Sequence, residues 1–179
     1  MKSTSLLPFL VLAFLLPFGL VAAEEGTLDP HLEPLRPFLG KTWRSEATEA
    51  GGEKAKVDVA RWERALNGKA LRVLHSINDG EYGGETIVRW DEQAKALVYH
   101  YFTTAGFTTT GTMSIQDGRI VSNEKVTGNA GGVTEVRGTA EMGGDGSFRM
   151  TTEYLKDGKW QPGRDAIYRE DAKAQVVFK

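Results

Sequence analysis

The sequence predicts an all-β protein, a single antiparallel up-and-down β-barrel of about ten strands. Short segments rich in Val, Thr and aromatic residues recur along the chain, and these residue types favour strands. Short Gly-containing turns separate the segments, so neighbouring strands are expected to be antiparallel, since parallel strands need long crossovers. Closure into a barrel covers the apolar faces and removes the sheet edges. A two-sheet sandwich is the alternative, although it usually needs longer connections.

The N-terminus is typical of a secretory signal peptide spanning Met1–Ala23. Lys2 precedes an apolar run at 6–16, and small residues at 21–23 form the expected cleavage site. The run contains two prolines and is shorter than the roughly 20 residues of a membrane span. We therefore expect an exported protein, periplasmic or extracellular, with no stable membrane span after cleavage. An uncleaved N-terminal anchor is the alternative.

After the signal peptide we expect a flexible leader at 24–31, one barrel domain at 32–170 and a C-terminal tail at 171–179 that frays or adds a short strand. The net charge is −2, which argues against nucleic acid as a partner. Cysteine is absent, which excludes thiol catalysis and Cys-ligated metals.

The domain is predicted to begin with a short helical turn at 31–39. Leu32, Leu35 and Leu39 recur at near-helical spacing, and two prolines keep the segment short. We expect this turn to cap one end of the domain. The first strand then follows at 40–49.

A central stretch contains two strong hairpin signals, Asn67-Gly68 and Asp79-Gly80. Both suit type I′ turns, in which the two central residues have positive φ. Two-residue turns at these positions place His75 opposite Ala60 on one side and Gly84 on the other, and directly opposed residues share a face. The residues predicted to face inward are Ala60, Trp62, Leu71, Val73, His75, Ile77, Tyr82, Gly84, Thr86, Val88 and Trp90.

Two registers are open for the next hairpin, between strands at 96–103 and 107–115. A three-residue loop at 104–106 places Tyr99 opposite Gly111, and a two-residue loop places His100 there instead. The turn residues favour the first register. The threonines of this second strand are interpreted as a solvated face. The remaining strands are predicted at 119–127, 133–141, 147–155 and 159–170.

The chain resembles domain of unknown function family fifteen-seventy-nine, a bacterial family, between Leu35 and Arg169. The order and spacing of several short motifs carry the resemblance: Leu39-Gly40 with Trp43, Arg61-Trp62, Leu66–Gly68, Tyr82–Gly84, Val88–Asp91 and Leu97–Phe102. The resemblance implies a lipocalin-like (calycin-type) barrel, related in shape to lipocalins and nitrobindins. It transfers no catalytic residue.

The inward position of His75 has two interpretations. It is either a hydrogen-bonded core histidine or a ligand contact. We do not expect His75 to be a haem ligand, because the haem-binding relatives place their haem-ligating histidine on a late strand, and the late strands of this chain contain no His. The small inner residues Ala60, Gly84 and Gly111 suggest a cavity, whereas aromatic residues often fill small barrels. The candidate ligand-binding residues are Trp62, His75, Tyr82, Trp90, Tyr99 and Met113.

The function expected first is binding of a small apolar or amphipathic ligand inside the barrel. One alternative is a hydrolase or isomerase with His75 as general base, which a carboxylate within reach of His75 would favour. Another is a solid barrel that acts as an envelope protein-interaction module. No catalytic residue is assigned, and no cofactor or metal is expected because the three His residues lack ligand spacing. The ligand and the oligomeric state stay open.

Overall fold

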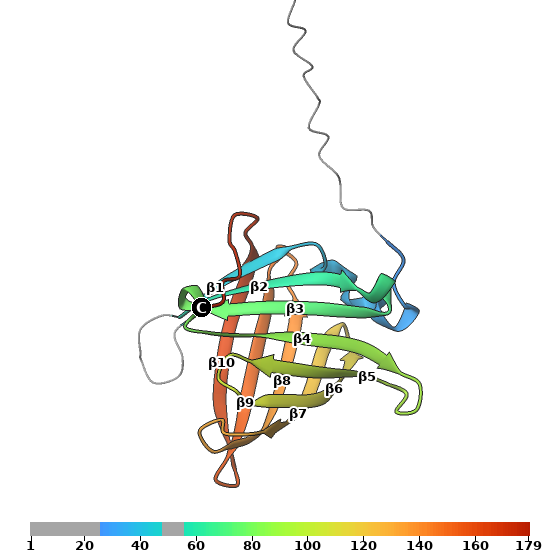
Figure 1. Cartoon of the computed structure of the whole chain (residues 1–179). Helices are drawn as coiled ribbons and strands as arrows, with labels where there is room; N and C mark the ends of the chain where they lie inside the picture. Colours follow the sequence, from blue (N-terminus) through green and yellow to red (C-terminus); the bar gives the residue numbers. More distant parts are fainter. Residues whose placement is uncertain (1–25, 48–55) are drawn as a thin grey trace, which may run out of the picture.

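The computed structural model describes residues 26–47 and 56–179, which form a closed antiparallel barrel of ten strands (Figure 1). The predicted fold class is confirmed, whereas the predicted signal peptide lies outside the described residues. The elements are η1 (Pro30–Phe38), β1 (Thr42–Ala47), β2 (Lys56–Ala65), η2 (Leu66–Gly68), β3 (Ala70–Ile77), η3 (Asn78–Gly80), β4 (Tyr82–Asp91), β5 (Ala96–Thr103), β6 (Thr108–Gln116), β7 (Arg119–Thr127), β8 (Val133–Met142), β9 (Phe148–Lys156) and β10 (Lys159–Glu170).

Each strand pairs with the next one along the chain, and β1 also pairs with β10 through Trp43 and Glu170. That last pair closes the barrel. Closure leaves no unpaired edge for another chain to extend. Alternate residues of every strand therefore face one shared interior.

Turn chemistry sets the register of β2, β3 and β4 as predicted. Asn67 and Asp79 have φ of 53° and 56°, and the glycines that follow them have φ of 85° and 92°. These values are those of type I′ turns. His75 consequently lies opposite Ala60 in β2 and Gly84 in β4, which confirms the predicted register.

The hairpin between β5 and β6 adopts the first of the two registers considered. Tyr99 lies opposite Gly111, and the N–H of Gly106 donates to the carbonyl oxygen of Thr103 at 3.2 Å. Gly106 has a φ of 83°, which a residue with a side chain adopts only with strain. A three-residue loop with glycine in this conformation explains the register.

The N-terminal helix is a 3₁₀-helix of nine residues, longer than the single turn expected, and it begins at Pro30. Residues three apart align along a 3₁₀-helix, so Leu32, Leu35 and Phe38 form one buried row. This row packs against the core at one end of the barrel, which we call the closed end (Figure 1). Asp29 fixes the start of the helix, because its N–H donates to the carbonyl oxygen of Gly68 at 2.8 Å.

The tail after β10 crosses the outer surface of the barrel and forms no strand. The N–H of Val177 donates to the hydroxyl of Ser76 at 3.0 Å. The Phe178 ring occupies the space where a Cβ on Gly83 would lie. The tail therefore ends against β3 and β4.

Candidate functional site

The interior of the barrel contains two adjoining cavities, so side chains do not fill it. The outer chamber, of about 620 Å³, reaches the end opposite η1, where Lys56 and Glu81 line it. The inner chamber, of about 260 Å³, extends toward the closed end. Six residues line both chambers, and we call the polar five of them the belt: His75, Tyr101, Glu124, Thr152 and Arg164.

The linings of the two chambers differ in polarity. Trp62, Ile120 and Phe148 line the inner chamber, together with other aliphatic side chains of the core. Tyrosines, Lys56 and Glu81 line the outer chamber. Because the belt separates these surroundings, an occupant that fills both chambers meets an apolar environment, a polar ring and a wetter mouth in turn.

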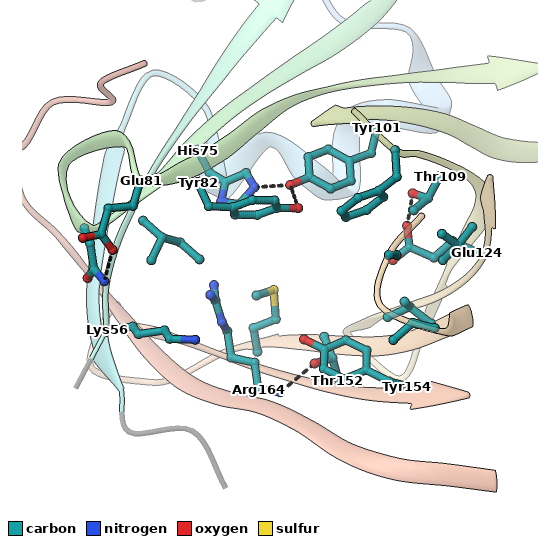
Figure 2. Close-up of a pocket in the computed structure, with 18 residues that line it drawn as sticks. Lys56, His75, Glu81, Tyr82, Tyr101, Thr109, Glu124, Thr152, Tyr154 and Arg164 are labelled. Carbon is teal, nitrogen blue, oxygen red and sulfur yellow. Dashed lines mark hydrogen bonds between the residues drawn. The ribbon is translucent and has the colours of Figure 1, made fainter. Parts of the chain in front are cut away.

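His75 lies at the centre of a hydrogen-bonded row (Figure 2). Its Nδ1 is 3.3 Å from Asp58 Oδ1, its Nε2 is 2.6 Å from the Tyr101 hydroxyl, and that hydroxyl is 2.7 Å from the hydroxyl of Tyr82. An ionised carboxylate only accepts hydrogen bonds. Nδ1 of His75 therefore donates to Asp58, and Nε2 bonds to the Tyr101 hydroxyl, so both nitrogens of the ring are engaged.

Asp58 is a buried carboxyl group with several partners. Its Oδ2 accepts hydrogen bonds from the Arg164 guanidinium and, at 2.8 Å, from the Tyr168 hydroxyl. Burial raises the pKa of Asp58, but the hydrogen bond and charge of His75, with Arg164 and Tyr168, outweigh it and hold that pKa below its ordinary value. Asp58 is therefore a satisfied, ionised group.

Glu124 is the second buried carboxyl group, and its surroundings are different. It projects from β7 into the wall shared by the two chambers. The Thr109 hydroxyl donates to its Oε2, and the Tyr99 hydroxyl contributes a further hydrogen bond. Burial raises the pKa of Glu124 above its ordinary value. Thr109 is thus buried and faces inward, contrary to the expectation that its threonine run forms a solvated face.

Two glycines in the barrel wall make room for these contacts. A Cβ on Gly84 would lie 2.4 Å from the Tyr101 ring, and one on Gly111 would lie 2.8 Å from Cβ of Glu124. The cavity that Ala60, Gly84 and Gly111 suggested is present, and Ala60 lines its inner chamber, but neither glycine lines a chamber. The glycines instead let Tyr101 reach His75 and let Glu124 approach β6 closely.

A β-bulge directs Arg164 into the barrel. Pro162 pairs with Glu153 and Asp165 pairs with Thr151, so the two residues between them on β10 face one residue on β9. One extra residue reverses the alternation of the strand, and Arg164 therefore faces the interior. The Pro-Gly dipeptide in mid-strand is the sequence signal that indicates this irregularity.

Sequence reasoning missed three of these residues, Asp58, Glu124 and Arg164. Asp58 follows from the predicted register, because it has the same parity as Ala60 on β2. Of the six candidate residues, Trp62, Tyr99 and Met113 line the inner chamber, Tyr82 lines the outer chamber and His75 lines both. The sixth, Trp90, lines neither chamber, because it lies at the end of β4 and belongs to the closed end.

The position of Trp90 is determined by the N-terminal segment. Its ring stacks on His31 with ring centroids 3.7 Å apart and an interplanar angle of 4°. Its indole nitrogen is buried and has no hydrogen-bond partner within the part of the chain that the structure describes. Trp90 therefore contributes to closing the barrel and lies away from the cavity.

Metal-binding clusters and membrane-spanning helices can be assessed for residues 26–47 and 56–179. No group of three or more His, Cys, Asp or Glu side chains within them is arranged to hold a metal ion. Their helices are too short and too polar to cross a membrane.

Comparison with known proteins supports the fold and goes no further. No family model matches the chain, and no curated protein matches it, so the family resemblance stays a prediction. Among solved structures, the chain is similar to the crystal structure of Rv2717c from M. tuberculosis, with a TM-score of 0.62 and 15% identity over 81% of this chain and 99% of that chain. At this identity the likeness shows a shared barrel fold alone.

Proposed function

We propose that this protein binds a small amphipathic molecule inside the barrel. The apolar part of the ligand occupies the inner chamber, and its polar part lies at the belt. The observation that carries this proposal is the change from an apolar lining to a polar one where the two chambers meet. The chamber volumes fall in or near the roughly 300–1,000 Å³ range of small-molecule pockets, which combine apolar walls with a few placed polar groups.

The belt would orient the ligand with little rearrangement. Three groups of the belt are held in place by one network, because His75 and Tyr101 belong to the row from Asp58 to Tyr82 and Arg164 bonds to Asp58. Side chains fixed before binding lose little entropy when a ligand arrives. A preformed polar ring next to an apolar cavity therefore favours selective binding.

Export is part of the same proposal. The pattern of Met1–Ala23 supports removal of a signal peptide and release of the barrel into the periplasm or the exterior. A closed barrel of lipocalin-like type, without cysteine, would need no disulfide to retain a ligand there. Mass spectrometry of the mature N-terminus from the native host tests this part.

Filling the inner chamber tests ligand binding directly. Ala140 lines that chamber, and Ala140→Phe would occupy it. The matched control is Thr110→Phe, which adds the same ring at an exposed position of β6. The uncharged fluorophore N-phenyl-1-naphthylamine should bind the unmodified protein and the control equally and Ala140→Phe at least tenfold more weakly. No uptake by the unmodified protein, or equal uptake by all three, would contradict the proposal.

One observation favours the hydrolase or isomerase as a second candidate. Asp58 lies 3.3 Å from His75 Nδ1 and can orient the ring, as a carboxylate does for a catalytic histidine. However, Tyr101 already occupies Nε2, and burial raises the pKa of Tyr101, so that its hydroxyl stays protonated. A base role would therefore require Tyr101 to leave, which ranks catalysis below binding.

The Tyr101→Phe variant separates the two candidates, because it frees Nε2 of His75. Faster turnover of a panel of small esters by Tyr101→Phe, abolished in the double variant with His75→Ala, would establish the catalytic reading. Unchanged background rates in all variants would leave binding as the function.

A further inference from the structure

We propose that Glu124 anchors the ammonium group of a small apolar amine, so that the ligand class of this barrel is lipophilic amines. The inference rests on the proposed function and deepens it. Four features of the belt and chambers support it, namely the partners of Glu124, its place between the chambers, the aromatic rings nearby and the balance of charge.

The first feature is that Glu124 has hydroxyl partners but no cation. Thr109 and Tyr99 hold the carboxyl group against β5 and β6, and within the described part of the chain no Lys, Arg or His forms an ion pair with it. A carboxylate offers about four acceptor positions, so two hydroxyl groups leave acceptor capacity. Buried carboxylates are normally paired with a positive charge, as Asp58 is with Arg164 in this barrel.

The second feature is the location of Glu124 at the junction of the two chambers. Its carboxyl group lines both, whereas Ile120, Met113 and Trp62 lie deeper, in the inner chamber alone. An ammonium group at Glu124 therefore places the hydrocarbon body of the ligand among apolar side chains. The arrangement fits a cation at one end of a short apolar molecule.

The third feature is a set of aromatic rings around the outer chamber. Tyr82 and Phe107 are stacked with ring centroids 6.3 Å apart and an interplanar angle of 19°. Tyr101 and Tyr154 line the same chamber on either side of Glu124 (Figure 2). Aromatic faces attract organic cations, and desolvation strengthens this attraction.

The fourth feature is the balance of the other charges that face the chambers. Arg164 is positive but forms an ion pair with Asp58, and His75 also bonds to that carboxylate. Lys56 and Glu81 line the mouth of the outer chamber with opposite signs. Among the described residues that line the chambers, Glu124 is therefore the buried acidic group that has no cation as a partner.

Amine binding should release a proton at any pH where Glu124 is protonated in the free protein. Because burial raises the pKa of Glu124, its carboxyl group retains its proton to higher pH than an exposed glutamate does. An ammonium ion that binds beside it stabilises the carboxylate, and the carboxylic proton passes to the buffer while the ammonium keeps its own protons. A neutral ligand of the same shape releases no proton.

Three probes with one apolar body test the inference by isothermal titration calorimetry: 2-phenylethylamine, 2-phenylethanol and 3-phenylpropanoate. The unmodified protein should bind the amine at least tenfold more tightly than the alcohol or the acid. Glu124→Gln keeps the shape and should abolish this preference. Glu141→Gln, a matched control at an exposed position of β8 outside both chambers, should retain it. Titrations in two buffers of different ionisation enthalpy, repeated at several pH values, should show proton release with the amine alone, and this release should increase toward acidic pH.

Equal affinity for the three probes, a preference for the alcohol or the acid, or amine binding without proton release at every pH tested would overturn the assignment of Glu124. If the barrel takes up N-phenyl-1-naphthylamine in those cases, the proposed function stands. Failure of all three probes together with that fluorophore would instead remove the proposed function. The proton-release measurement uses the unmodified protein and does not depend on folding of the variant.

Discussion

Asp58 and Glu124 are both buried carboxyl groups that face the interior, yet they lie on opposite walls of the barrel and have opposite surroundings. Asp58, on β2, has Arg164, His75 and Tyr168 as partners, and its pKa is lowered. Glu124, on β7, has hydroxyl groups as partners, and its pKa is raised. Burial alone therefore does not assign a role to an internal acid, whereas its partners do.

The difference separates a structural wall from a binding wall. On the Asp58 side, each charge has an opposite charge within hydrogen-bonding distance, so this side connects β2, β3 and β10. On the Glu124 side, the carboxyl group is held in position but keeps capacity for another partner. Three predictions test this division, from the largest expected effect to the smallest.

Arg164→Met should lower the free energy of unfolding by about 3–5 kcal/mol, because removal of one partner leaves a buried carboxylate without its main counter-charge. Urea unfolding followed by tryptophan fluorescence measures the loss. The control is Arg149→Met, which breaks an exposed ion pair between Arg149 of β9 and Asp165 of β10 and should change the midpoint little. Similar losses in the two variants would show that the Asp58 wall is not a structural centre.

Gly111→Ala should destabilise the protein by about 1–3 kcal/mol, because the added Cβ would lie 2.8 Å from Cβ of Glu124 and 2.2 Å from the carbonyl oxygen of Asn123. The same variant should weaken amine binding, since Glu124 must move. Gly144→Ala is the control, because a Cβ at Gly144 meets no atom within 4 Å. Thermal unfolding of both variants checks the effect, and equal midpoints would contradict it.

The pH dependence of stability should differ in sign between the two acids. The lowered pKa of Asp58 stabilises the fold above about pH 4, and this contribution disappears as pH falls through the pKa of the folded state. The raised pKa of Glu124 acts in reverse, since its contribution is present at acidic pH and is lost as pH rises through that pKa.

The loss of unfolding free energy in Asp58→Asn, relative to the unmodified protein, should therefore become smaller below about pH 4. Glu124→Gln should gain stability relative to the unmodified protein as pH rises through the raised pKa of Glu124 in the folded state. Urea midpoints between pH 3.5 and 8 measure both trends. If the two variants follow pH in the same direction, the contrast between the walls is wrong.

Most of the barrel follows from local sequence. The dipeptides Asn67-Gly68 and Asp79-Gly80 fix two turns, and each turn fixes the register of the strands beside it. That register correctly places His75 on the inner face opposite Ala60. The same alternation indicates that Asp58 faces inward, although its partners lie on β3 and β10.

Other features depend on contacts between segments far apart in the sequence. Arg164 enters the barrel through a bulge, and it meets Asp58 because β10 closes against β1. Trp90 leaves the cavity because His31, from the N-terminal segment, stacks on it. No local pattern around either residue specifies its partner.

The sequence by itself therefore determined the number and order of the strands, the turns between them and the inner face of the central hairpins. The sequence could determine these features because the φ preferences of turn residues and the two-residue period of a strand act over only a few neighbouring residues. Only the tertiary structure decided that the interior is hollow, that Asp58 has a cation as a partner and that Glu124 has only hydroxyl partners among the described residues. Those outcomes depend on which walls face each other after closure, and closure joins strands from the two ends of the domain.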